Sequence, residues 1–279
     1  MRHPSARPFL AAGLAAALLF GAAACGSDSE GASDKTTTTA AGGSDTTAAP
    51  NADVPDPITV CSDIPYAPME FEGDGPRGLA YTGFDIELMD AMAADLGSKL
   101  DVIDSDFDGI LGNLAAGTCD VVASSLTITP EREKEVDFTE PYFDADQSLL
   151  VKTDSGIKSL DDLAGKRIGV QSSTTGQLYA NDHKPDGAEI VEFSDTDGMF
   201  GALESGDVDA LLQDLPVNAG RVTEDDSVEV VETYKTDEQY GFAVEKGSDL
   251  KATLDQALKD VRDDGTYDEL YEKYFPKAG

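Results

Sequence analysis

The residue types that could bind a small charged molecule are concentrated between positions 120 and 132. Ser124 and Ser125 directly follow a short apolar run, Thr127 lies two positions later, and Arg132 stands seven residues after Ser125. Hydroxyls and backbone N–H groups are neutral donors, whereas a guanidinium is a planar fork that matches both oxygens of a carboxylate. The spacing therefore predicts a carboxylate-binding site, although an arginine on a solvated helical turn fits the residue types equally well.

The elements that must position these residues alternate between strand-like and helix-like patterns. Strands are expected at 58–61, 121–123, 167–170, 190–193 and 210–212, and helices at 84–96, 108–116, 176–181, 197–205, 250–262 and 267–274. Apolar residues recur at amphipathic spacing in the helix 84–96. A further short helix is expected to begin with Thr129 as N-cap and Pro130 as first helical residue. The alternation predicts an α/β fold with mostly parallel sheets.

One connection between a helix and a strand occurs twice. The pattern Leu-x-x-Gly-x-x-Asp occupies residues 114–120 and again 203–209, each time directly before an apolar strand. Two copies about ninety residues apart suggest two similar lobes; chance agreement of a common connection is the alternative.

Polar residues follow four of the expected strands. Ligands of open α/β sheets bind beyond the carboxyl ends of strands, so these side chains are candidates for one site. Two lobes that face each other would enclose such a site between them. The four strand ends are Ser62-Asp63, Ser124-Ser125, Gln171-Ser172 and Gln213-Asp214.

The charge of the chain excludes one class of partner. The formal net charge is −35, and the segment from residue 56 onward carries −33 of it. Nucleic-acid binding requires basic patches, so nucleic acid is not expected as a partner. His183 is the only histidine after residue 55, which disfavours histidine-based catalysis.

Two cysteines lie in this acidic segment, Cys61 on an expected strand and Cys119 just before another. The sequence does not decide whether they form a disulfide. The oxidising setting of an exported protein permits one, whereas a stagger between the two strands can place the cysteines beyond the limit of about 7 Å between Cα atoms. The sequence has no CxxC motif and no Cys/His cluster, so no metal site is expected.

The N-terminus has the pattern of an export signal. Residues 1–24 combine a basic start with an apolar run that is short for a membrane span, and Cys25 follows small residues, as in a bacterial lipobox. The usual leucine three positions before the cysteine is Ala22 here, and an ordinary signal peptide with an incidental cysteine is the alternative. Residues 25–55 are rich in Ser, Thr, Gly, Ala and Asp and cannot bury enough apolar surface to fold, so they are expected to form a disordered tether from a lipid anchor on the outer face of the membrane.

Four segments together resemble the polar amino-acid-binding proteins of bacterial ABC importers, which are family 3 extracellular solute-binding proteins. The resemblance covers residues 58–275 and is carried by 63–68 with 83–86, by 107–110 with 124–132, by 165–175, and by 213–214 with 264–275. It implies a two-lobed, type II periplasmic-binding-protein-like fold with chain crossings near Asp146 and Gln239. Lobe 1 would comprise 56–146 and 240–279, and lobe 2 would comprise 147–239.

The resemblance also implies a role for individual residues. Arg132, helped by Thr127 and the backbone near Ser125, would bind the α-carboxylate of an amino acid. Asp214 would bind the α-ammonium from the other lobe; capping of the following helix is the alternative for this residue. The remaining implied ligand contacts are Thr174 and Thr175 at the charged end, Tyr66 and Phe107 as aromatic faces on the side chain, Ser124, and Asp63 at the distal group. Core packing is the alternative for Phe107.

A carboxylate at Asp63 favours an amino acid whose side chain bears N–H groups, either basic or glutamine-like. The resemblance implies a monomeric receptor without cofactor or metal, whose partner is a cognate ABC permease. An enzyme on the same fold, such as a dehydratase, and a ligand-sensing module are the alternatives. An enzyme would need a positioned acid or base besides the groups that bind the ligand.

Overall fold

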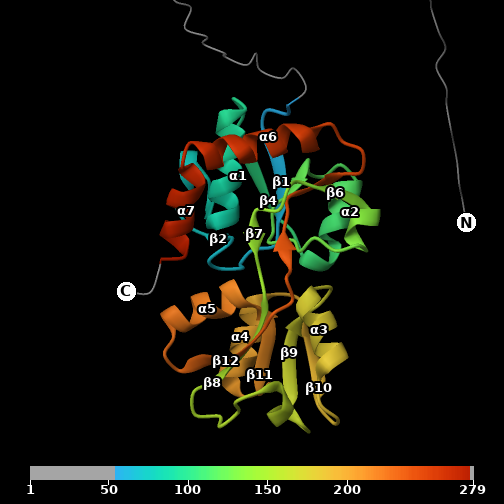
Figure 1. Cartoon of the computed structure of the whole chain (residues 1–279), viewed down its shortest axis with the longest axis vertical. Helices are drawn as coiled ribbons and strands as arrows, with labels where there is room; N and C mark the ends of the chain where they lie inside the picture. The colour runs from blue at the N-terminus through green and yellow to red at the C-terminus, as the bar shows by residue number, and fades with distance from the viewer. Residues whose placement is uncertain (1–53, 277–279) are drawn as a thin grey trace, which may run out of the picture. The chain divides into compact units, whose positions relative to one another are not determined.

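Two five-stranded sheets organise residues 54–276, the part of the chain that the computed structural model describes (Figure 1). These residues belong to one compact unit. The expected leader, the lipidated Cys25 and residues 26–53 of the expected tether lie outside the described residues. None of the described helices is both long enough and apolar enough to cross a membrane.

The first sheet has the order β4-β1-β5-β14-β6. Strand β1 pairs in parallel with β4 and β5, and β14 pairs antiparallel with β5 and β6. The strands are β1 (Ile58–Ser62), β4 (Leu100–Asp104), β5 (Val121–Val122), β6 (Val136–Phe138) and β14 (Ala243–Glu245). The helices of this half are α1 (Phe84–Asp95), α2 (Ile110–Ala115), α6 (Leu250–Asp263) and α7 (Thr266–Tyr274).

The second sheet has the order β10-β9-β11-β8-β12. Strand β9 is parallel to β10 and β11, whereas β8 is antiparallel to β11 and β12. The strands are β8 (Gln147–Lys152), β9 (Arg167–Gln171), β10 (Glu189–Phe193), β11 (Ala210–Asp214) and β12 (Val228–Tyr234). The helices are α3 (Thr175–His183), α4 (Thr196–Ser205) and α5 (Leu215–Glu224).

Two short strands connect the two halves. Strand β7 (Phe143–Asp144) precedes the second sheet in the chain, β13 (Gln239–Tyr240) follows it, and the two pair antiparallel (Figure 1). The expected parallel pairs are present, and each sheet also contains antiparallel strands that the βα alternation did not predict. The remaining short elements are β2 (Phe71–Glu72), β3 (Tyr81–Thr82) and the 3-10 turns η1 (Pro76–Gly78), η2 (Phe107–Gly109), η3 (Arg132–Lys134) and η4 (Leu160–Leu163).

The helix expected from Thr129 is wrong in its start and its type. Only the 3-10 turn η3 forms, beginning at Arg132, and Thr129 Oγ1 accepts a hydrogen bond from the Arg132 N–H at 3.2 Å. Thr127 and Ile128 are held in extended conformation against β13, because Thr127 bridges to Tyr240 and the Ile128 N–H donates to the Gln239 carbonyl at 2.8 Å.

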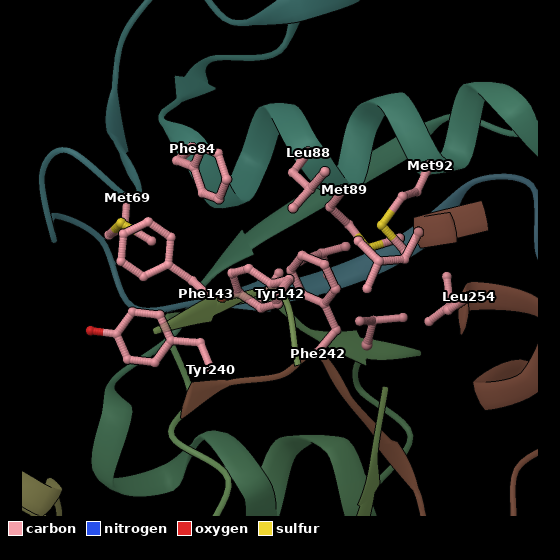
Figure 2. Close-up of a cluster of buried hydrophobic side chains, with 14 of the residues drawn as sticks. Met69, Phe84, Leu88, Met89, Met92, Tyr142, Phe143, Tyr240, Phe242 and Leu254 are labelled. Atoms are coloured by element: carbon pink, nitrogen blue, oxygen red, sulfur yellow. The ribbon is translucent and has the colours of Figure 1, made fainter. Parts of the chain in front are cut away.

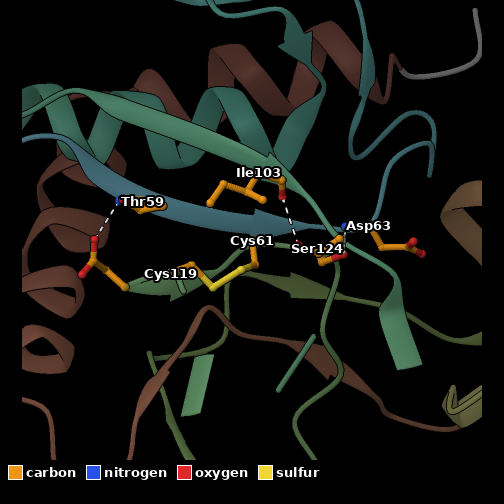
Figure 3. Close-up of a disulfide and its surroundings, with 8 residues drawn as sticks. Thr59, Cys61, Asp63, Ile103, Cys119 and Ser124 are labelled. Carbon is orange, nitrogen blue, oxygen red and sulfur yellow. Dashed lines mark hydrogen bonds between the residues drawn. A yellow bond between two sulfur atoms is a disulfide. The ribbon is translucent and has the colours of Figure 1, made fainter. Parts of the chain in front are cut away.

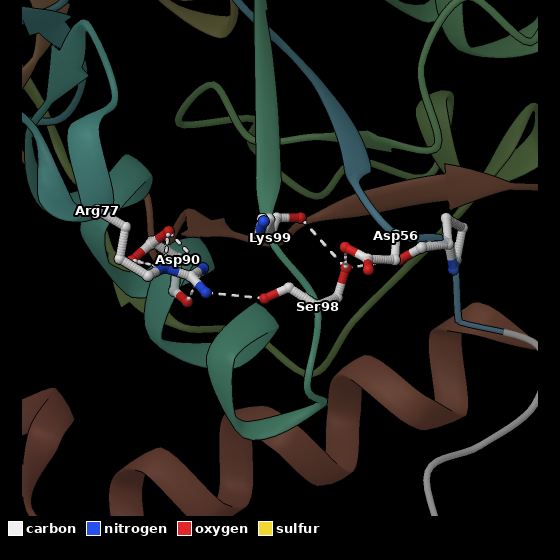
Figure 4. A network of polar contacts seen from close by, with 6 residues as sticks. Asp56, Arg77, Asp90, Ser98 and Lys99 are labelled. Atoms are coloured by element: carbon white, nitrogen blue, oxygen red, sulfur yellow. Dashed lines mark hydrogen bonds and ion pairs between the residues drawn. The ribbon is translucent and has the colours of Figure 1, made fainter.

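Helix α1 forms where expected but is not amphipathic. Eight of its twelve residues are buried, including Asp85 and Asp90, because α6 and α7 pack against it. Its C-terminal end is held by Arg77, whose guanidinium binds the Asp90 carboxylate and donates to the Ser98 carbonyl at 2.8 Å (Figure 4). Ser98 Oγ in turn donates to the Pro55 carbonyl at 2.6 Å, so the network fixes the chain where it enters β1.

The repeated connection folds identically in both halves. The Asp120 carboxylate accepts from the Thr59 N–H at 2.8 Å (Figure 3). In return, the Asp120 N–H donates to the Thr59 carbonyl at 2.8 Å. Asp209 makes the same two bonds with Arg167, both at 2.8 Å. Gly117 and Gly206 precede these residues with φ of 69° and 82°, a conformation that glycine adopts without a steric penalty. We call each pair of reciprocal bonds an aspartate bracket.

The core of the first half combines α1 with the two connecting strands. Phe84, Tyr142, Phe143, Tyr240 and Phe242 pack together with methionine and leucine side chains (Figure 2). The rings of Tyr142 and Phe242 stack with centroids 4.2 Å apart. Because Phe143 and Tyr240 belong to β7 and β13, the connecting strands are anchored in this core.

The structure shows whether the two cysteines after residue 55 are paired. Cys61 and Cys119 form a disulfide with a Cα–Cα distance of 5.7 Å (Figure 3). Both residues are buried. The stagger is present, since Cys61 pairs with Val122, but Cys119 precedes β5 and lies outside the paired strand, within bridging distance of Cys61.

Candidate functional site

One small cavity is lined by all ten residues that the sequence nominated for ligand binding, together with Glu70 and Gln171. Its volume is about 20 Å³, little more than the space of one water molecule, so the two halves stand closed around it. The lining comes from both halves: Gln171, Thr174, Thr175 and Asp214 belong to the second, and the others belong to the first. The nominated residues are Asp63, Tyr66, Phe107, Ser124, Ser125, Thr127, Arg132, Thr174, Thr175 and Asp214.

Arg132 reaches the cavity from the start of η3. Its Nη1 donates to the Thr127 carbonyl at 2.8 Å, and its Nη2 donates to the Ser173 carbonyl of the other half at 3.1 Å. The guanidinium lies 5.4 Å from the centroid of the Phe107 ring, so Phe107 lines the site and is not only a core residue. Within residues 54–276 no ion pair joins Arg132 to a carboxylate.

Asp214 is the acidic group contributed by β11. Tyr66 donates to Asp214 Oδ2 at 3.0 Å, Tyr240 donates to the same oxygen, and Gln147 Nε2 donates to Oδ1. Its side chain makes no capping bond to α5, although it occupies the N-cap position. Burial raises the pKa of Asp214, and the three hydrogen bonds oppose that rise.

Two further carboxyl groups face the cavity from the first half. Asp63 accepts from Gln171 Nε2 at 2.6 Å, and burial, with the nearby Asp104, raises its pKa to about 6. Glu70 is fully buried and accepts from the hydroxyls of Ser124 and Ser125 at 3.2 and 3.3 Å. Burial raises the pKa of Glu70 well above its usual value.

The turn after β5 is fixed by a buried acid that does not line the cavity. Ser125 has φ of 47°, an unfavourable region for a residue with a Cβ. Its N–H donates to Asp85 Oδ2 at 2.7 Å, and Tyr142 donates to the same oxygen at 2.6 Å. Burial raises the pKa of Asp85 to about 7. Asp85 thereby holds Ser125 in the conformation that presents its hydroxyl to Glu70.

The two threonines at the start of α3 differ in the contacts that their hydroxyls make. Thr174 caps the helix: its Oγ1 accepts from the Gln177 N–H at 3.1 Å and donates to the Gln171 carbonyl at 2.8 Å. Thr175 Oγ1 lies 3.4 Å from Thr127 Oγ1 of the first half and 3.4 Å from Glu238 Oε2. Thr174 Oγ1 therefore bonds within its own half, whereas Thr175 Oγ1, which also accepts from Gln147 Nε2 at 3.3 Å, bridges the two halves.

Sequence reasoning assigned no role to four residues of this neighbourhood, although it placed Gln171 among the polar strand ends. Glu70 and Gln171 line the cavity, and Gln147 Nε2 links Asp214 to Glu238, with 2.8 Å to the latter. A signal existed for two of them. Glu70 is an isolated acid between Met69 and Phe71, and Gln171 ends a strand. Gln147 and Glu238 carry no local signal, because their position beside Asp214 results from the chain crossings.

Comparison with known proteins places the chain in a family. A family model described as bacterial extracellular solute-binding proteins, family 3, matches residues 58–277. The lysine/arginine/ornithine-binding periplasmic protein of Escherichia coli K12 is 32% identical over 245 residues, which cover 82% of this chain and 92% of that protein. The glutamine-binding protein GlnH of Bacillus subtilis is 37% identical over 198 residues, covering 69% and 72%.

A solved structure supports the same assignment. An ancestral arginine-binding protein bound to arginine superposes with a TM-score of 0.72 at 39% identity, covering 79% of this chain and 99% of that one. The expected two-lobed type II fold is thus confirmed. The chain belongs to the bacterial extracellular solute-binding proteins of family 3.

Proposed function

We propose that this chain captures an L-amino acid in the cavity and delivers it to the permease of an ABC importer. The carrying observation is one cavity with a guanidinium from one half and a buried carboxylate from the other. Arg132 would bind the ligand's carboxylate, with Thr127 and the backbone near Ser125. Asp214 would bind its ammonium. Because these groups come from different halves, a zwitterion that binds both would close the cleft.

The lobes we propose comprise 56–146 with 240–279, and 147–239. The strands of the first sheet all fall within the former ranges and those of the second sheet within the latter, which supports these boundaries. We further propose that residues 1–24 direct export, that Cys25 is lipidated, and that residues 25–55 tether a monomeric receptor to the outer face of the membrane.

The ligand class follows from the charges left after the zwitterion is bound. Asp63 and Glu70 then remain, and no lysine or second arginine lines the cavity among the described residues. A cationic side chain would compensate the two carboxyls, so we favour a basic amino acid, with glutamine as second choice. Glutamate and aspartate would bring a carboxylate that finds no cation. The faces of Tyr66 and Phe107 suit a guanidinium or ammonium.

We propose a binding protein and not an enzyme. Among the described residues no histidine lines the cavity, and His183 is exposed on α3. The carboxyl groups in the cavity are engaged by hydrogen bonds that suit a binding site. Incubation of the chain with the bound amino acid should leave the amino acid chemically unchanged.

A thermal-shift screen against the amino acids and ornithine tests this proposal. A ligand at a hundred to a thousand times its Kd stabilises the fold by about 3–4 kcal/mol, or roughly 6–16 °C for a domain of this size. We expect such a shift with arginine, lysine or ornithine. Arg132→Ala and Asp214→Ala should each abolish it, whereas the exposed Arg167→Ala and Asp182→Ala should not. A shift retained in both cavity variants would contradict the assignment.

A further inference from the structure

Ser173 and Asp108 face each other from opposite halves without lining the cavity. Ser173 directly precedes the helix-capping Thr174, and Asp108 directly follows Phe107. Both side chains are exposed, beside cavity-lining neighbours. Neither residue is therefore positioned to touch an enclosed ligand, and any effect on binding must act through closure of the cleft.

Ser173 makes two contacts across the cleft. Its hydroxyl donates to Asp108 Oδ1, and its carbonyl accepts from Arg132 Nη2 at 3.1 Å. Its own N–H is held within the second half by Gln177 Oε1 at 2.9 Å. One residue thus joins the proposed carboxylate-binding guanidinium and the first half to the start of α3.

The backbone of Ser173 adopts an unfavourable conformation to do so. Its φ is 63°, in the left-handed region where a Cβ is costly. Such a conformation persists where surrounding contacts stabilise it. The contacts available here are the Gln177 bond and the two bonds across the cleft.

We infer that Ser173 is a positioning residue that stabilises the closed cleft and slows release of the ligand; this inference rests on the proposed function. Arg132 also donates to the Thr127 carbonyl on its own side at 2.8 Å. The Ser173 carbonyl therefore fixes the second Nη of the guanidinium only when the halves meet. Closure and the orientation of the carboxylate-binding fork are coupled through this residue.

A double-mutant cycle on the full chain tests the inference. Dissociation of L-arginine is followed by stopped-flow for wild type, Ser173→Ala, Asp108→Ala and the double variant; L-lysine and L-glutamine serve in turn if arginine does not bind. We expect each single change to raise the dissociation rate about three- to tenfold, as for loss of one ordinary hydrogen bond at an exposed position. The association rate should change little, and the double variant should match the single ones. Ser172→Ala, next to the contact, should behave as wild type.

Unchanged dissociation in the single variants, or additive effects in the double variant, would overturn the inference. Small-angle scattering of the ligand-free chains separates it from the proposed function, because the same N-terminal segment contributes to every variant. If no amino acid binds wild type, the proposed function has failed and scattering alone decides. A larger radius of gyration for Ser173→Ala than for Ser172→Ala would then support the role of Ser173 in keeping the cleft closed, and equal radii would refute it.

Discussion

At the residue scale, the cavity sets three carboxyl groups, Asp63, Glu70 and Asp214, against one guanidinium. Burial raises the pKa of all three acids, so their ionised forms are disfavoured in the free protein. A ligand that brings cationic groups would relieve this cost. The imbalance is thus an electrostatic preference for a ligand with more positive than negative charge.

Affinity for a basic amino acid should depend on pH through Asp63. Its pKa of about 6 means that it is about one-tenth ionised at pH 5. Because the cationic side chain would bind the ionised form, we expect the Kd for arginine to rise about tenfold from pH 8 to pH 5. Isothermal titration calorimetry across this range measures the change.

Asp63→Asn is the control for this dependence. The variant should bind arginine more weakly at pH 8, and its Kd should change less with pH. If the Kd of the variant depends on pH as in wild type, Asp63 is not the group responsible, and Glu70 becomes the candidate. The free energy of unfolding of the ligand-free chain should change with pH in the direction opposite to the affinity, so that it falls as the pH rises. A carboxyl whose pKa is raised from 3.8 to about 6 stabilises the fold below pH 4, and this contribution is lost as the pH rises through 6.

All ten residues nominated for the site line one cavity. Polar types at strand ends pointed to four of them, and the family resemblance supplied the aromatic residues and the threonines before and in α3. Asp63, Ser124 and Asp214 each stand where an apolar run stops. Whether each of them contacts a ligand stays a prediction. Glu70 escaped because burial of an acid depends on partners that are distant in sequence, here the hydroxyls of Ser124 and Ser125.

At the element scale, the apolar runs predicted five of the six strands that have a parallel neighbour, β1, β5, β9, β10 and β11, and missed the sixth, β4. They did not predict β8, β12, β14 or β6. Their antiparallel pairing depends on the two chain crossings, which leave no periodic signal. The turn at Arg132 was mispredicted for a similar reason, because its preceding residues pair with β13, more than a hundred positions away.

The disulfide should be a major contributor to stability at this scale. It closes a loop with a separation of 58 residues, and the loss of chain entropy in the unfolded state predicts about 4 kcal/mol. Cys61→Ala combined with Cys119→Ala should therefore lower the free energy of unfolding by about 3–4 kcal/mol in urea titrations. Cys25→Ala is the matched control and should leave unfolding unchanged. An equally stable double variant would show that the bridge is dispensable.

At the scale of the whole molecule, the acidic surface extends to the mouth of the cavity. The net charge is −35. Asp104, Asp106 and Asp195 all raise the pKa of Asp63 electrostatically, so their fields reach the cavity. Such a field attracts cationic ligands and is screened by salt.

Association of a basic amino acid should therefore slow with ionic strength. We expect the association rate of arginine to fall about three- to tenfold between about 20 mM and about 500 mM NaCl, measured by stopped-flow. Glutamine, which is net neutral, should show almost no change. Equal salt slopes for the two ligands would mean that the acidic surface does not steer binding.

The two aspartate brackets have a consequence for recombining this fold. In each bracket the aspartate binds only backbone groups of the neighbouring strand. The side chains of Thr59 and Arg167 therefore do not affect how the bracket sets the register of the strand that follows the aspartate. Chimaeras with homologues that keep the aspartate should tolerate crossover points just upstream of positions 120 and 209. The brackets thus mark positions at which ligand-contacting segments could be exchanged between homologues without disturbing the sheets.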